Sequence, residues 1–238
     1  MLNALRVLFH FIGLLIRYFI KGIQVSKLPV EERREQGLKY VQIIGNRTLD
    51  STRARVVYHG LENLPEDRSF YIIANHQSYF DIPTIMRVMD RPTAFIAKNS
   101  LSKVPLLHRW LENLGCLYLD RDDARQAVTI MKQAAEQMEQ GMNMVIFPEG
   151  TRSKGKQTHE FRRGSLKPAF LAKVPIVPVM LDGTANIFEA NPGFAVRPAE
   201  VHVYVGRPIE TAEMSRTEQK ELSGVIGEII FKQKEIIR

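Results

Sequence analysis

The sequence is poor in the residue types that cross-link proteins or bind metal ions. Its 238 residues include one cysteine, Cys116, so an intramolecular disulfide is excluded and a reducing compartment is expected. The six histidines are scattered and lack the His/Cys spacing that is typical of a metal site. We therefore expect neither a bound metal nor a cofactor. Internal repeats and low-complexity segments are also missing, as in an ordinary globular chain.

Acidic residues are outnumbered by basic ones, 26 to 33, which gives a net charge of +7. This excess favours an anionic partner such as a phosphate, a nucleic acid or an anionic membrane surface. The basic residues do not alternate with aromatic residues in stripes, and no RNA- or DNA-binding signature is present. Nucleic acid is therefore not expected as a partner.

The amino-terminal segment, residues 2–25, is apolar but lacks a long run free of charge. Its longest stretch without Lys or Arg is Val7 to Ile16, about half of the ~20 residues that span a bilayer. On a helix, the polar residues fall within about 60° of each other, and they are Asn3, Arg6, His10, Arg17, Lys21 and Gln24.

This pattern predicts a helix that lies in the membrane interface, with the basic stripe facing headgroups. The side chains expected to enter the acyl region are Phe9, Phe11, Ile12, Leu15 and Phe19. A tilted spanning helix is the main alternative, and a helix of the protein core is a further one. A signal peptide is disfavoured because Arg17 and Lys21 follow the apolar run and no small-residue cleavage site is present.

Pro29 separates this segment from a second helical stretch at about residues 31–50. Residues 1–50 are therefore predicted to form a two-helix membrane-association element. Beyond it, residues 51–238 alternate between strand and helix patterns, which predicts one α/β domain with a mainly parallel or mixed sheet flanked by helices. Strands are expected at 54–59, 70–74, 93–97, 116–120, 142–147, 176–181 and 200–205, and helices at 82–89, 105–114, 124–140 and after Ser215.

The stretch from Phe70 to Pro83 combines a buried strand with polar residues at its carboxyl end, where open α/β sheets bind ligands. His76 can act as a base, and Asp81, five residues on, can orient the imidazole and stabilise its protonated form. The alternative is that Asp81 only caps the following helix. A nucleophilic role for Ser78 is disfavoured because the Gly-x-Ser-x-Gly elbow is missing.

A second polar stretch follows the strand at 142–147. Glu149, Gly150, Thr151 and Arg152 offer a guanidinium, a hydroxyl and backbone N–H groups, which together suit a phosphate. Lys98 and Arg121 also fall at or just past strand ends. We take these six residues as substrate-binding candidates.

Four stretches, in this order, resemble the motifs of the glycerolipid acyltransferases, most closely of the lysophosphatidic acid acyltransferases. They are Asn75-His76-x-x-x-x-Asp81, Gly115 to Arg121, Phe147 to Ser153, and Val174 to Pro178. The motifs span nearly half of the chain, and the first and third are individually distinctive.

The resemblance implies that His76 deprotonates the free sn-2 hydroxyl of lysophosphatidic acid with support from Asp81. The oxygen would attack an acyl thioester of coenzyme A or acyl carrier protein and give phosphatidic acid without a covalent acyl-enzyme. The resemblance also implies that Glu149, Gly150 and Arg152, with Arg121, bind the phosphate. It implies a membrane-associated enzyme of phospholipid synthesis, at the cytoplasmic face of the cell membrane.

Two rival interpretations remain open. One is a related acyltransferase that acts on another lysophospholipid or on glycerol 3-phosphate with the same His-Asp pair. The other is a catalytically idle, membrane-bound lipid-binding protein, which would have no need of both His76 and Asp81.

Overall fold

The computed structural model describes residues 2–120, 123–155, 161–162 and 164–237. Within these ranges, seven strands form one sheet in the order β2-β9-β7-β3-β6-β4-β5. The strands are β2 (Arg55–His59), β3 (Tyr71–Ala74), β4 (Thr93–Lys98), β5 (Leu117–Leu119), β6 (Asn143–Ile146), β7 (Ile176–Asp182) and β9 (Glu200–Val205). The predicted fold class, and each strand expected from the sequence, are confirmed.

Strand direction decides which loops meet. Five strands are mutually parallel, namely β7, β3, β6, β4 and β5. Strand β9 runs antiparallel to β7, and β2 pairs in parallel with β9, so β2 and β9 share the opposite direction. The carboxyl ends of the five parallel strands therefore lie along one edge of the sheet. Strand β3 is at the centre and buried at every residue, as a continuous apolar run in a parallel sheet should be.

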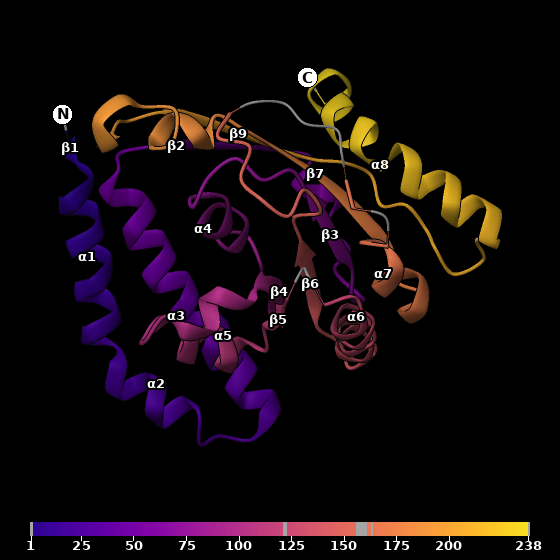
Figure 1. Ribbon diagram of the computed structural model, residues 1–238, viewed down its shortest axis with the longest axis horizontal. Helices are drawn as coiled ribbons and strands as arrows, with labels where there is room; N and C mark the ends of the chain where they lie inside the picture. Colours follow the sequence, from indigo (N-terminus) through magenta and orange to yellow (C-terminus); the bar gives the residue numbers. More distant parts are fainter. Residues whose placement is uncertain (1, 121–122, 156–160, 163, 238) are drawn as a thin grey trace.

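Helices cover both faces of the sheet (Figure 1). They are α1 (Ala4–Arg17), α2 (Phe19–Val25), α3 (Val30–Ser51), α4 (Asp81–Met86), α5 (Leu107–Leu114), α6 (Ala124–Glu139), α7 (Lys167–Ala172) and α8 (Arg216–Ile236). The helices from α1 to α5 gather on one side, and α6, α7 and α8 lie on the other. Helix α8 begins with the capping box of Ser215 and Glu218. Helix α7 was not expected, because six residues are too few to show a helical period.

The amino-terminal segment forms two helices rather than the single one expected, with a break at Tyr18. The prediction that Leu15 faces lipid is wrong. Its side chain is 4% exposed and packs with Leu14, Ile44 and Trp110 in a small core of its own. Leu15 is buried because α1 and α2 pack against α3 and α5, and the sequence alone does not reveal these neighbours.

The rest of the outer face of α1 and α2 remains apolar and exposed. It consists of Leu5, Leu8, Phe9, Ile12, Ile16, Phe19 and Ile20. No helix in the described ranges is both long and apolar enough to cross a bilayer.

Helix α3 also anchors the helix that carries Asp81. The side-chain amide of Gln42 donates to the backbone carbonyls of Met86 and Met89, at 2.8 and 2.7 Å. These carbonyls lie at and just beyond the carboxyl end of α4, where helical carbonyls have no partner within their own helix. The contact fixes α4, and with it the turn that precedes α4, against the amino-terminal helices.

Candidate active site

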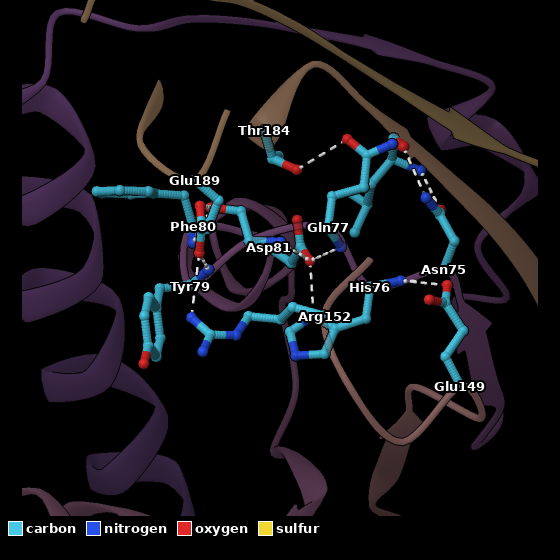
Figure 2. A network of polar contacts seen from close by, with 12 residues as sticks. Asn75, His76, Gln77, Tyr79, Phe80, Asp81, Glu149, Arg152, Thr184 and Glu189 are labelled. Carbon is cyan, nitrogen blue, oxygen red and sulfur yellow. Dashed lines mark hydrogen bonds and ion pairs between the residues drawn. The ribbon is translucent and has the colours of Figure 1, made fainter. Parts of the chain in front are cut away.

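The first candidate residues follow strand β3 at the carboxyl edge of the sheet. Asn75 exchanges two hydrogen bonds with the backbone of Leu181 in β7, at 2.9 and 2.7 Å, which fixes the point where the chain leaves the sheet. His76 comes next, and Asp81 begins α4. The Nδ1 atom of His76 lies 2.6 Å from Oδ2 of Asp81 (Figure 2). The turn between them therefore brings together the two side chains that the sequence singled out.

Asp81 organises this turn. Its side chain is 0% exposed, and Oδ2 also accepts from the backbone N–H groups of Gln77 and Ser78, at 2.7 and 2.8 Å. Both N–H groups precede α4, so the carboxylate stabilises the turn and is not a helix N-cap. Because a carboxylate only accepts, Nδ1 of His76 carries the hydrogen and Nε2 carries the lone pair. With the His76 side chain 17% exposed, Nε2 can accept a proton from a substrate hydroxyl.

The stretch after β6 holds His76 from a second side. The ring of Phe147 stacks on the imidazole with centroids 4.2 Å apart. Oε1 of Glu149 accepts from the backbone N–H of His76 at 2.9 Å, and the N–H of Ser153 donates to the carbonyl of His76 at 2.7 Å. Four contacts, counting Asp81, thus fix the position of this one residue.

Glu149 lies in an environment that disfavours its charge. Burial raises the pKa of its carboxyl group to about 7, and the nearby negative charge of Asp81 adds to the rise. The hydrogen bond from the His76 N–H acts in the opposite direction. Oε2 of Glu149 is buried and has no hydrogen-bond partner within the described part of the chain.

The remaining residues of this stretch differ in what they can offer a phosphate. Gly150 takes a left-handed conformation with φ 76°, which glycine adopts without strain, and its N–H donates to the Phe147 carbonyl. With the N–H of Ser153 bound to His76, these two backbone donors are already used. Thr151 is exposed. Among these four candidates, the guanidinium of Arg152 is the only positively charged group.

Arg152 is held by two residues. Its Cζ lies 3.4 Å from the centre of the Tyr79 ring, and its Nη1 lies 3.1 Å from Oε1 of Glu189. Glu189 was missed by the sequence analysis. It lies after β7 between two short 3-10 helices, Thr184–Ile187 and Pro192–Phe194, which are too short to show a period in the sequence. Only its acidic character after the fourth motif could have drawn attention to it.

Lys98 does not join this network. It is exposed at the end of β4 and lines a separate depression of about 320 Å³, together with Asn99, Ser100, Lys103, Leu119, Asp120 and Arg162. Arg121, the other basic candidate, lies outside the described residues. Ser78 is 0% exposed, and its Oγ donates to Glu189 at 2.7 Å, so it is not presented as a nucleophile.

Comparison with known proteins identifies the family. Residues 55–182 match the family model described as Acyltransferase. The chain is 30% identical to a 1-acyl-sn-glycerol-3-phosphate acyltransferase of Borreliella burgdorferi over 77% of this chain and 73% of that protein. It is 28% identical to a probable 1-acyl-sn-glycerol-3-phosphate acyltransferase of Mycoplasma pneumoniae over 80% of this chain and 73% of that one.

Comparison with a solved structure supports the same family. The crystal structure of a 1-acyl-sn-glycerophosphate acyltransferase from Thermotoga maritima superposes with a TM-score of 0.78 at 29% identity, over 98% of this chain and 95% of that one. The chain therefore belongs to the acyltransferase family that includes the 1-acyl-sn-glycerol-3-phosphate acyltransferases, and it is an O-acyltransferase.

Proposed function

We propose that this enzyme transfers a fatty acyl group from a thioester to the sn-2 hydroxyl of lysophosphatidic acid and forms phosphatidic acid. The observation that carries the proposal is the 2.6 Å contact between His76 and Asp81, which leaves Nε2 of His76 as a base beside the anion-binding Arg152. Both lie among the loops at the carboxyl ends of the parallel strands, where a small site can hold the hydroxyl and the phosphate of one acceptor.

In this mechanism Nε2 of His76 accepts the hydroxyl proton while the oxygen forms a bond to the thioester carbonyl carbon. The tetrahedral intermediate then collapses, the carbon–sulfur bond breaks, and the imidazolium returns the proton to the departing thiolate. Asp81 stabilises the imidazolium between the two steps. No protein nucleophile is needed, in keeping with the burial of Ser78.

Arg152 is proposed to bind the acceptor phosphate. The phosphate of lysophosphatidic acid is only a few bonds from the reacting hydroxyl, so it must lie near His76. Stacking on Tyr79 orients the guanidinium, and a guanidinium can hold two phosphate oxygens at once. We propose that Glu149, Gly150 and Thr151 contribute to the shape of this site, with Glu149 acting through the backbone of His76.

The donor is proposed to bind over the carboxyl ends of β4 and β5. Strand β6 lies between β3 and β4, so at about 4.8 Å per strand the end of β4 is roughly 10 Å from that of β3. Groups bound over the ends of β4 and β5 therefore lie about two strands away from an acceptor hydroxyl at His76. The depression with Lys98, Lys103 and Arg162 suits the phosphates of a phosphopantetheine thioester, carried by coenzyme A or by acyl carrier protein.

Residues 1–50 are proposed to dock the enzyme on the cytoplasmic face of the cell membrane. The apolar face of α1 and α2 is large and uncovered, and basic residues such as Arg6 and Arg17 are exposed on α1. Such helices lie in the interface and gain from anionic lipid. A site that takes its acceptor from the bilayer gains from the same docking.

The test is an assay of the purified enzyme with lysophosphatidic acid, other lysophospholipids and glycerol 3-phosphate, each with acyl-CoA or acyl carrier protein as donor. Mass spectrometry should identify phosphatidic acid as the main product, and His76→Ala should form it at least about 10²-fold more slowly. Preference for another acceptor would identify the enzyme as a related acyltransferase that is specific for that acceptor. Equal turnover of an uncharged monoacylglycerol would remove the role of Arg152 as a phosphate-binding residue.

A further inference from the structure

Glu189 connects the two halves of the site. It comes from the segment between β7 and β8 (Ala195–Val196), and its side chain is 5% exposed. Oε2 accepts from the hydroxyl of Ser78 at 2.7 Å, and Oε1 accepts from the backbone N–H of Tyr79 at 2.9 Å and from Arg152 at 3.1 Å (Figure 2). One buried carboxylate therefore touches both the turn after His76 and the anion-binding arginine.

The turn is fixed by two carboxylates, one at each end. Asp81 binds the N–H groups of Gln77 and Ser78, and Glu189 binds the hydroxyl of Ser78 and the N–H of Tyr79. Since Asp81 both terminates this turn and contacts His76, displacement of the turn would displace Asp81 from Nδ1. Hydrogen bonds to charged groups are among the stronger ones, so loss of Glu189 should loosen the turn.

On its other side Glu189 holds Arg152. Within the described part of the chain, the only hydrogen bond that the Arg152 side chain makes is the one from Nη1 to Glu189. Tyr79 covers one face of the guanidinium. The Nε and Nη2 groups are thereby left for a ligand, and the direction in which they point is set by the contact at Nη1. An almost fully buried carboxylate also requires a cationic partner, and Arg152 supplies it.

We propose that Glu189 is a positioning residue that couples the phosphate-binding Arg152 to the His76–Asp81 base. The proposal rests on the proposed function, because it assigns Glu189 a part in acceptor binding and in proton transfer at the same site. It requires that loss of Glu189 impair both kcat and the acceptor KM, whereas loss of Ser78 or of Arg152 impairs only one of them. Arg152→Ala should raise the acceptor KM about 10–100-fold with kcat within threefold, and Ser78→Ala should lower kcat about tenfold with KM unchanged.

The experiment measures kcat and KM for lysophosphatidic acid in the variants Glu189→Ala, Glu189→Gln, Arg152→Ala and Ser78→Ala. Glu221→Ala, at an exposed glutamate of α8, is the matched control and should behave as the wild type. Glu189→Ala should lower kcat about tenfold and raise KM about tenfold or more. Glu189→Gln keeps an oxygen acceptor for Tyr79 and Arg152, so it should restore kcat to within threefold and leave part of the KM defect.

A second comparison separates coupling from a general loss of structure. In the Arg152→Ala background, Glu189→Ala should lower kcat further but add little to KM, because the KM effect passes through Arg152. With an uncharged monoacylglycerol as acceptor, Glu189→Ala should lower kcat and leave KM unchanged.

The proposal is overturned if folded Glu189→Ala stays within threefold of wild type in both parameters, or if its KM effect adds in full to that of Arg152→Ala. If Glu189→Ala does not fold, the test rests on Glu189→Gln. An unchanged acceptor KM in Glu189→Gln then overturns the proposal. Failure of the proposed function is seen separately, as a wild-type enzyme that does not acylate lysophosphatidic acid.

Discussion

Replacement of Asp81 by asparagine removes one negative charge from the site and keeps an oxygen acceptor in the same place. Oδ2 of Asp81 accepts three N–H donors, from Nδ1 of His76 and from the backbones of Gln77 and Ser78, at 2.6, 2.7 and 2.8 Å. Three donors on one oxygen select the orientation in which the asparagine oxygen takes that place. Its amide nitrogen then occupies the place of Oδ1, which is buried and has no hydrogen-bond partner among the described residues.

The magnitude follows from what the charge does in the transition state. In the proposed mechanism His76 becomes cationic as it takes the proton, and a hydrogen bond to a charged group contributes about 1.5–3 kcal/mol. Loss of that contribution lowers kcat by about 10–150-fold, since 1.36 kcal/mol is tenfold in rate. His76→Ala removes the base itself and should lower kcat by at least about 10²-fold, within the range of general-base catalysis.

The stability of both Asp81 variants has to be measured beside kcat. Alanine leaves the buried N–H groups of Gln77 and Ser78 without an acceptor, at about 1–3 kcal/mol for each. At about 2–4 °C per kcal/mol for a chain of this size, Asp81→Ala should melt roughly 4–24 °C below wild type. Asp81→Asn keeps the acceptor for Gln77 and Ser78 but buries its own amide N–H2 group without a partner, so it should also melt below wild type, and its kcat is compared at a temperature where both proteins are folded.

The assay follows thiol release from acyl-CoA with lysophosphatidic acid in mixed micelles, beside thermal unfolding of each variant. Wild-type kcat in Asp81→Asn would refute the role given to the Asp81 charge. A folded His76→Ala with more than a tenth of wild-type kcat would refute the assignment of the base.

Three further predictions concern other parts of the molecule. The raised pKa of Glu149 means that the folded state disfavours its ionised form. The contribution of Glu149 to the free energy of unfolding is therefore highest below pH 4.5, falls as the pH rises through about 7 and is lowest above that. Glu149→Gln keeps the acceptor for the His76 N–H, so it should raise the melting temperature by a few degrees at pH 8 and hardly at pH 4.5; an equal shift at both would contradict the pKa argument. Lys98→Ala should raise the KM of acyl-CoA about 3–10-fold and leave that of acyl-pantetheine, which has no phosphate, unchanged, whereas equal effects on both donors would remove Lys98 from phosphate binding. Phe9→Glu combined with Ile16→Glu, at positions 68% and 61% exposed, should weaken sedimentation with anionic vesicles by about 2–4 kcal/mol without a change in melting temperature, and unaltered binding would exclude this face from docking.

The sequence by itself determined the features that depend on near neighbours in the chain. The buried run at Tyr71–Ala74, the capping box of Ser215 and Glu218, and the positions of the seven strands of the sheet along the chain could be predicted because period and caps are local. The pairing of His76 with Asp81 belongs to the same class, since five residues of turn suffice to bring them together.

Only the tertiary structure decided what depends on distant segments. Leu15 is buried because α3 and α5 lie behind it, and no helical wheel of residues 2–25 contains that information. Glu189 contacts Ser78 across 111 residues and Arg152 across 37, and it meets them because β7, β3 and β6 are adjacent and parallel, so that the loops at their carboxyl ends converge. A glutamate with no sequence motif around it contacts the site only because the order of strands in the sheet brings its loop there.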